Sequence, residues 1–133
     1  MIFVDTGAFV ARYVPRDAHH RRARKAWVGI ERSRERCATS SFVLDETFTL
    51  LGRRTSYAFA AERARALLSS AALVVLRPDA DDESKAVDLF AKFADQEVSF
   101  TDCVSFVLMR RHGLNRAFTF DRHFAAAGFE VAP

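Results

Sequence analysis

Apolar residues follow two alternating patterns along this chain. Short apolar runs bounded by polar or turn-forming residues are typical of buried strands, and apolar residues that recur every three or four positions are typical of amphipathic helices. The expected strands are 2–4, 37–39, 73–76, 117–120 and 129–131. The expected helices are 7–13, 17–34, 40–52, 56–70, 78–94, 101–112 and a short one between Asp121 and Gly128. Strands that alternate with helices favour an α/β sandwich around a mostly parallel sheet with right-handed crossovers.

Capping and turn residues indicate where the helices begin and end. Pro15 ends the first helix, and Asp17 is a candidate cap for the long basic helix. Gly52 is expected to end the apolar helix that begins at Ser40 or Ser41. No linker, repeat or low-complexity tract interrupts the pattern, so we expect a single domain over residues 1–133.

Charge is unevenly distributed over the chain. The net charge is +3 and the sequence pI is near 9.2, an excess too small to establish nucleic-acid binding by itself. Nine of the 20 basic residues lie between Arg12 and Arg36, where the helix 17–34 combines an apolar stripe with a positive face. That face is either a solvated helix surface or a phosphate-binding surface, and the sequence leaves both open.

Cysteine usage and hydropathy indicate the cellular compartment in which the protein is expected. Cys37 and Cys103 form no C-x-x-C pair and are surrounded by core-like residues, so neither a disulfide framework nor a zinc site is expected. No apolar run approaches 18 residues, and Asp5 interrupts the apolar start of the chain almost at once. We expect a cytoplasmic protein in a reducing compartment, without membrane association.

Three carboxylates fall where strands give way to helices. Asp5 and Asp121 follow two strands, and Asp102 lies in the first turn of the apolar helix 101–112. In open parallel sheets, functional groups gather outside the carboxyl ends of the strands, so these side chains are expected to face one crevice. Other readings stay open, because Asp102 also fits a Ser99-x-x-Asp102 capping box and Asp121 fits a plain N-cap.

Glu46 is the fourth candidate, on the apolar helix 40–52. At about 100° per residue, Glu46 lies at the flank of the apolar arc, whereas the neighbouring Asp45 lies opposite it. Glu46 is therefore the acid expected to be partly buried. A second acidic group at the start of helix 78–94 is expected to be structural, because acids in a first helical turn complement the helix dipole. Its members are Asp79, Asp81, Asp82 and Glu83.

Converging carboxylates require protons or a cation. At a separation of about 5 Å, each like-charged pair costs on the order of 3 kcal/mol at an effective dielectric constant of about 20. Several such pairs would consume much of a typical folding stability. Oxygen ligands without His or thiolate suit hard cations such as Mg²⁺ or Mn²⁺, which can activate water and neutralise a phosphodiester.

Four segments resemble the acidic motifs of PIN-domain ribonucleases, and the similarity is greatest to the VapC toxins of bacterial toxin–antitoxin pairs. The segments are Val4–Phe9, Ser41–Thr47, Ser99–Cys103 and Phe118–Phe124, in the family's order and spacing. The resemblance implies an α/β/α sandwich with a parallel sheet of four or five strands. It also implies Mg²⁺- or Mn²⁺-dependent endoribonuclease activity, a homodimer and inhibition by a cognate antitoxin.

The resemblance assigns roles residue by residue. Asp5, Glu46, Asp102 and Asp121 would form the catalytic metal site, and hydroxyl partners would come from Thr6 and Thr119. Many relatives carry Ser where this chain has Gly7, so one polar contact is absent here. We expect a water to attack an RNA phosphodiester, leaving a 5′-phosphate and a 3′-hydroxyl. The four histidines lack metal-ligand spacing and are expected at the surface or at helix ends, with His123 the best candidate for a substrate contact.

Other functions compete with the toxin nuclease. One is a housekeeping RNA-processing nuclease, and another is a non-catalytic RNA- or partner-binding module that uses the acids to dock an Arg-bearing peptide. An aspartyl-phosphate phosphohydrolase would also place Asp after the first strand, but such enzymes commonly carry a second Asp where this chain has Gly7. For the antitoxin we expect apolar residues in a groove beside residues 42–70, lined by Trp27 and Phe residues unless these pack in the core.

Overall fold

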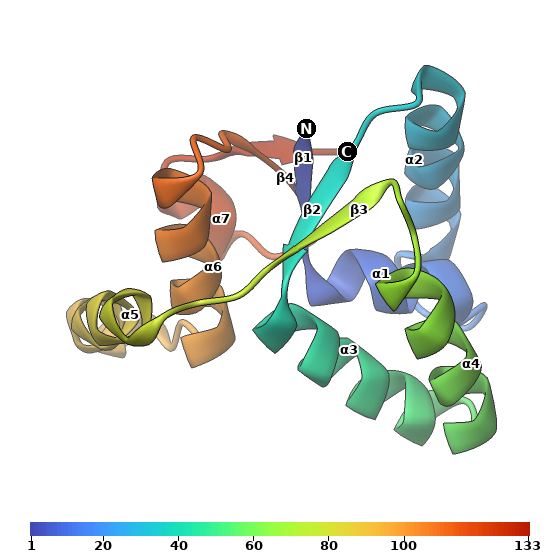
Figure 1. Cartoon of the computed structure of the whole chain (residues 1–133), viewed down its shortest axis with the longest axis horizontal. Helices are drawn as coiled ribbons and strands as arrows, with labels where there is room; N and C mark the ends of the chain where they lie inside the picture. The colour runs from blue at the N-terminus through green and yellow to red at the C-terminus, as the bar shows by residue number, and fades with distance from the viewer.

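Five parallel strands form one sheet with the first strand at its centre (Figure 1). The computed structural model describes all residues, Met1–Pro133. The strands are β1 (Ile2–Val4), β2 (Cys37–Ser40), β3 (Leu73–Leu76), β4 (Arg116–Phe118) and β5 (Glu130–Ala132). Their order is β3-β2-β1-β4-β5, and every neighbouring pair is parallel. The expected parallel α/β sheet is confirmed, with five strands.

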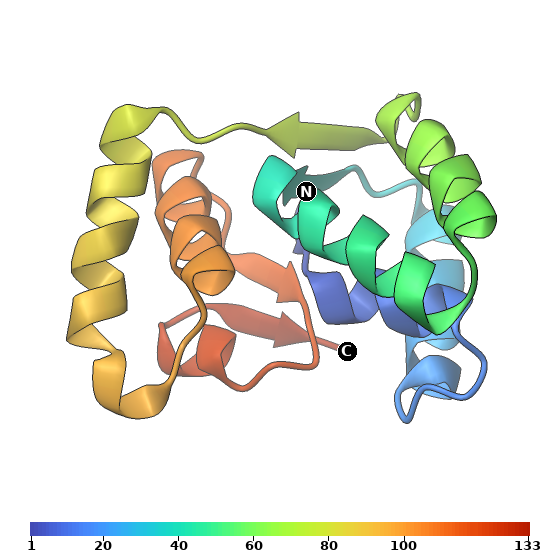
Figure 2. The same cartoon turned by 90° about the horizontal axis from the view of Figure 1, so that it is seen from below.

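Helices cover both faces of this sheet in two groups. The helices are α1 (Thr6–Tyr13), α2 (His20–Ser33), α3 (Ser41–Arg54), α4 (Tyr57–Leu68), α5 (Ala80–Lys92), α6 (Phe100–Arg111) and α7 (His123–Ala126), with a 3-10 turn η1 (Ala94–Gln96). Figure 1 shows α5, α6 and α7 on one side of the strands and α2 and α4 on the other. Figure 2 shows α3 between the two groups. The result is a three-layer α/β/α arrangement.

Two boundaries differ from the sequence-based expectation for packing reasons. Helix α3 does not end at Gly52 but continues to Arg54. Gly52 is buried, and a Cβ there would lie 2.5 Å from the ring of Tyr57, so glycine permits the close approach of α4 rather than a helix stop. Strand β4 ends at Phe118, not at residue 120, because the amide of Asp121 turns back to donate to the Thr119 hydroxyl at 2.9 Å.

Asp17 does not cap the basic helix, which begins only at His20. Its carboxylate instead accepts hydrogen bonds from the His19 amide at 2.9 Å and from the Arg54 guanidinium at 2.6 Å. The loop between α1 and α2 is thereby fixed to the end of α3. Cys37 and Cys103 are buried and free, as expected.

The core places the ends of β1 and β4 side by side. Phe3, Val4 and Phe118 are almost fully buried, and α6 is buried along most of its length. The register pairs Val4 with Phe118, and the Asp5 amide donates to the Phe118 carbonyl at 3.0 Å. The residues that follow these two strands therefore emerge together at the carboxyl edge of the sheet.

None of the helices has the length and apolar character needed to cross a membrane.

Candidate active site

The four predicted acids line one open cleft at the carboxyl edge of the sheet. Its volume is about 650 Å³. The lining residues are Asp5, Thr6, Gly7, Glu46, Leu50, Glu97, Ser99, Asp102, Phe120, Asp121, Arg122 and His123. Only two of the twelve are hydrophobic, so the cleft is a polar surface suited to a charged ligand.

Asp5 and Asp121 are linked through one hydroxyl. The Thr119 hydroxyl donates to the Asp5 carboxylate at 2.8 Å and accepts from the Asp121 amide at 2.9 Å. Asp5 occupies the N-cap position of α1, but its side chain makes no capping bond. Its carboxylate is therefore held by Thr119 and faces the cleft, because it is not used to cap the helix. Thr119 thus contacts two of the predicted acids.

Asp102 is positioned by the start of α6. The Ser99 hydroxyl accepts from the Asp102 amide at 3.1 Å, which caps the helix. No reciprocal bond runs from the Asp102 carboxylate to the Ser99 amide, so only half of a capping box forms. The carboxylate stays available to the cleft, although the residue is only 6% exposed.

Glu46, not Asp45, lines the cleft. Glu46 is half-buried on α3, while Asp45 is exposed on the same helix and contributes nothing to the lining. This placement follows the apolar arc, because Val43, Leu44 and Thr47 are the residues that bury α3 against the rest of the molecule.

Burial and mutual repulsion perturb the ionisation of two acids. Burial raises the pKa of Asp5 to about 6, although hydrogen bonds from Thr119 and the Thr6 amide act in the opposite direction. Burial, followed by the negative charges of Asp5 and Asp121, raises the pKa of Asp102 to about 8. No Lys or Arg forms an ion pair with any of the four acids. The only basic side chain paired with the cluster is His123, which lies near Asp121 and Asp102 and offsets their charge only when it is protonated.

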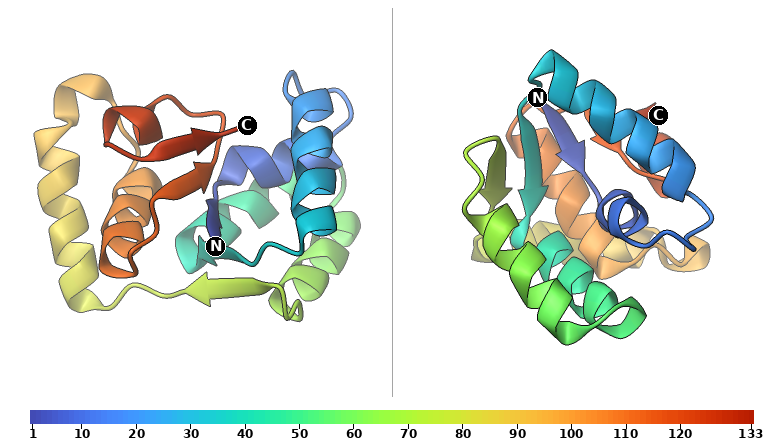
Figure 3. Two further views of the ribbon diagram at one scale, coloured as in Figure 1. Left: turned by 90° about the horizontal axis from the view of Figure 1, so that it is seen from above. Right: turned by 90° about the vertical axis from the view of Figure 1, so that its right-hand side faces the viewer.

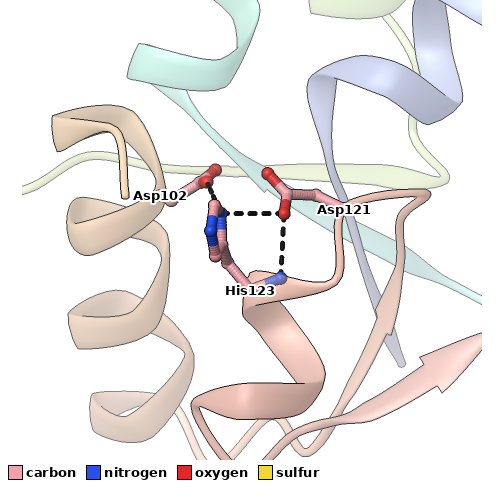
Figure 4. Close-up of side chains that lie close together, drawn as sticks. All are labelled: Asp102, Asp121 and His123. Carbon is pink, nitrogen blue, oxygen red and sulfur yellow. Dashed lines mark hydrogen bonds and ion pairs between the residues drawn. The ribbon is translucent and has the colours of Figure 1, made fainter. Parts of the chain in front are cut away.

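His123 joins the acids, which the spacing argument did not anticipate (Figure 4). Its amide donates to the Asp121 carboxylate at 2.8 Å, and its Nδ1 lies 2.9 Å from that oxygen and 3.9 Å from Asp102. The 2.9 Å contact of Nδ1 lacks hydrogen-bond geometry, and Nε2 is buried without a partner. Asp102, Asp121 and His123 can bring ligand atoms within 4.8 Å of one another. The available signal was the Asp-x-His spacing after a strand.

The two expected hydroxyl partners, Thr6 and Thr119, differ in whether they contact the acids. The Thr6 hydroxyl is buried and has no hydrogen-bond partner, so the expected contact to the acids is not formed there.

Two further cleft residues carry charge that the sequence analysis did not single out, Glu97 and Arg122. Both come from turns between elements, where periodicity gives no indication of side-chain direction.

A parallel α/β sandwich with carboxylates clustered at the carboxyl edge of its sheet is the arrangement expected of an acidic-site nuclease. Residues 2–130 match the family model of the PIN domain. VapC20 of Mycobacterium tuberculosis, described as a 23S rRNA-specific endonuclease, is 40% identical over 134 residues, covering 100% of this chain and 99% of the relative. The chain therefore belongs to the PIN-domain family, and within it to the VapC-type toxin endonucleases.

Solved structures agree with this assignment. The crystal structure of M. tuberculosis VapC20, described as a sarcin-ricin loop cleaving toxin, has a TM-score of 0.88 and 37% identity, covering 97% of this chain and 96% of that one. A toxin–antitoxin complex from Klebsiella pneumoniae has a TM-score of 0.68 at 16% identity, covering 100% and 97%. The DNA-bound VapBC complex from Salmonella typhimurium has a TM-score of 0.64 at 17% identity, covering 99% and 98%. The last two show likeness of fold alone.

Proposed function

We propose that this chain is a divalent-metal-dependent endoribonuclease whose site consists of Asp5, Glu46, Asp102 and Asp121. The observation that carries the proposal is a cluster of carboxylates that no Lys or Arg neutralises. Four carboxylates line one cleft, and burial raises the pKa of two of them, Asp5 and Asp102. A cation would relieve both the repulsion and the desolvation.

The donor set fits Mg²⁺ or Mn²⁺. Carboxylate oxygens of Asp5, Glu46 and Asp102 are hard ligands, and the open cleft leaves room for water and for a substrate phosphate. When bound, such a cation lowers the pKa of water and neutralises charge on a phosphodiester. One ring nitrogen of His123 could serve as a further metal ligand beside Asp102 and Asp121.

The protein's own contribution is to hold these acids in place. Thr119 fixes the orientation of Asp5 and, through the Asp121 amide, the turn that carries Asp121. The Ser99 cap fixes the first turn of α6 and with it Asp102. Attack of water on the phosphodiester would leave a 5′-phosphate and a 3′-hydroxyl, and the proton lost by that water can be accepted by a carboxylate rather than by a general-base His.

The test is RNA cleavage by purified Asp5→Asn and Glu46→Gln proteins in Mg²⁺, compared with Asp45→Asn. The first two should lose most of the cleavage rate, and the third should retain it, because Asp45 lies outside the cleft. Circular dichroism would establish that each variant is folded. Undiminished cutting by folded Asp5→Asn and Glu46→Gln proteins would contradict the assignment. Mapping the cleaved ends on total RNA, with ribosomal RNA examined first, would define the substrate.

A cognate antitoxin is the partner that the toxin family implies. The candidate docking surface is a groove of about 450 Å³ beside α2, α4 and β3. Trp27 belongs mainly to the core, where its ring packs at a tilt against Phe9 and Phe118, but it also lines this groove with Ile30 and Leu67. We expect an apolar segment of the antitoxin to bind there.

Cell growth separates the toxin from a housekeeping nuclease. Growth should stop when the protein is expressed and resume when a small neighbouring gene is co-expressed. Deleting the carboxy-terminal segment of that gene's product should relieve inhibition, and an unchanged inhibition would exclude this docking mode. The homodimer stays a prediction, which light scattering of the purified protein would test.

A further inference from the structure

A stack of aromatic and basic side chains borders the acidic cleft. Phe120, which lines the cleft next to Asp121, lies parallel to the His19 ring, with centroids 4.4 Å apart and an interplanar angle of 3°. The Arg22 guanidinium carbon lies 5.4 Å from the centroid of the Phe120 ring. The acidic-site chemistry uses none of these three side chains. We call them the His19–Phe120–Arg22 stack.

The stack joins segments far apart in the sequence, and each is fixed independently. Asp17 accepts from the His19 amide and from Arg54, which ties the α1–α2 loop to the end of α3. Phe120 lies between Thr119 and Asp121, whose mutual hydrogen bond fixes its backbone. Figure 3 shows the end of β5 directed toward α2. One of these bonds, from the Asp121 amide to the Thr119 hydroxyl, also positions the acids.

Core packing does not account for this arrangement. His19 and Arg22 are exposed and Phe120 is only half-buried, whereas Phe118, which meets Phe120 edge-on at 6.0 Å, is fully within the core. Phe120 covers one face of the His19 ring, and His19 is exposed, so a base that stacks on this ring would approach its other face. An exposed flat ring beside a guanidinium is the chemistry that binds unpaired nucleobases and their phosphates.

We propose that the His19–Phe120–Arg22 stack binds an unpaired nucleotide of the RNA substrate adjacent to the cleavage site. The base stacks on the face of His19 opposite Phe120, and Arg22 contacts a neighbouring phosphate. The inference rests on the proposed ribonuclease function, because it places this nucleotide beside the acids.

Binding to RNA that cannot be cut tests the stacking. In an Asp102→Asn background, fluorescence anisotropy with a labelled single-stranded RNA should show about ten-fold weaker binding for His19→Ala, the scale of one lost stacking contact. His19→Phe should restore the affinity, since it keeps a stacking ring. His112→Ala is the matched control, because His112 is an exposed histidine at the opposite end of α6 from Asp102. An abasic site at the stacked position should weaken binding to His19 protein but not to His19→Ala protein.

Salt dependence tests the phosphate contact. Arg22→Ala should reduce the slope of log affinity against log salt by roughly 0.7, the value for one phosphate of a single strand. Arg24→Ala serves as a neighbour on the same helix that does not contact Phe120. An effect of Arg24→Ala equal to that of Arg22→Ala would overturn the specific role of Arg22.

Two outcomes separate this inference from the proposed function. If the wild-type protein cleaves RNA with Mg²⁺ and His19→Ala leaves both RNA affinity and KM unchanged, the stack is not a substrate site although the nuclease assignment stands. If His19→Ala weakens RNA binding and His19→Phe restores it in protein that shows no cleavage, the nuclease assignment fails and the stack remains an RNA contact. Weaker antitoxin binding by His19→Ala without any change in RNA affinity would assign the stack to the protein partner and overturn the proposal.

Discussion

Two groups of four carboxylates occur in this molecule, and they differ in whether Lys or Arg side chains pair with them. At the start of α5, Asp79 and Asp82 form a reciprocal capping box, Arg111 pairs with Asp82 at 2.7 Å, and Lys85 pairs with Asp81 at 3.0 Å. A backbone hydrogen bond from Asp82 is the main cause of the lowered pKa of Asp79. In the cleft, the acids have no Lys or Arg partner, and burial raises the pKa of Asp5 to about 6.

The contrast shows that acid density does not define a site. What separates the two groups is whether the fold supplies partners for the charge. Asp82 is as buried as any acid in the cleft, at 1% exposure, yet its charge is used in hydrogen bonds and an ion pair. The cleft acids are left with repulsion and desolvation that only protons or a bound cation can offset.

The largest expected effect is on catalysis. Loss of a residue that only supports a metal ligand costs up to roughly 100-fold in activity. Asp102→Asn should reduce the rate of single-turnover RNA cleavage by more than that. Asp81→Asn, which neutralises an exposed acid of the α5 group, should leave cleavage unchanged. Equal losses in the two variants would mean that overall negative charge, rather than the cleft, governs the reaction.

The same neutralisation should have opposite effects on stability in the two groups. Asp82→Asn removes the charge that pairs with Arg111 and weakens the capping box, and should lower the free energy of unfolding by about 1–2 kcal/mol. Asp102→Asn relieves repulsion, and should raise the free energy of unfolding of the metal-free protein at pH 8 by on the order of 1 kcal/mol. Urea unfolding in EDTA measures both, and effects of the same sign would remove the distinction.

Metal affinity should depend on the Thr119 hydroxyl but not on the Thr6 hydroxyl. Thr119→Val removes the hydroxyl that orients Asp5 and accepts from the Asp121 amide, and should weaken Mg²⁺ binding by roughly 10-fold. Thr6→Val should change it little, because the Thr6 hydroxyl has no partner. Isothermal titration calorimetry with Mg²⁺ measures both affinities. A larger loss for Thr6→Val would show that this hydroxyl acquires a role on metal binding.

The pH dependence of stability of the metal-free protein tests the charge of the cleft directly. The raised pKa values of Asp5, about 6, and Asp102, about 8, mean that the native state binds protons that the unfolded chain has released. In EDTA, stability should therefore fall as pH rises from about 4 to about 8. Mg²⁺ should raise Tm more at pH 8 than at pH 5.5, because protons compete for the carboxylates. In the Asp5→Asn, Asp102→Asn double variant the fall should be reduced, and an unchanged fall would assign it to other groups.

Much of the fold was predictable because local rules decided it. The strands and helices follow from hydrophobic periodicity, and their alternation gives the parallel sheet. The prediction for Gly52 is wrong because a helix-ending glycine and a glycine that admits Tyr57 look alike in sequence. The prediction that Asp17 caps a helix is wrong because its partner, Arg54, is 37 residues away, where local rules do not reach.

The sequence by itself determined where acids emerge from strands, and the helical arc distinguished Glu46 from Asp45. Both are local consequences of backbone period. Only the tertiary structure decided which acids lack partners, that Thr119 rather than Thr6 holds Asp5, and that His123 lies against Asp121 and Asp102. It alone brought His19 onto Phe120, across 101 positions of the chain. The physical reason is that desolvation and charge compensation depend on neighbours contributed by distant segments, which periodicity does not encode.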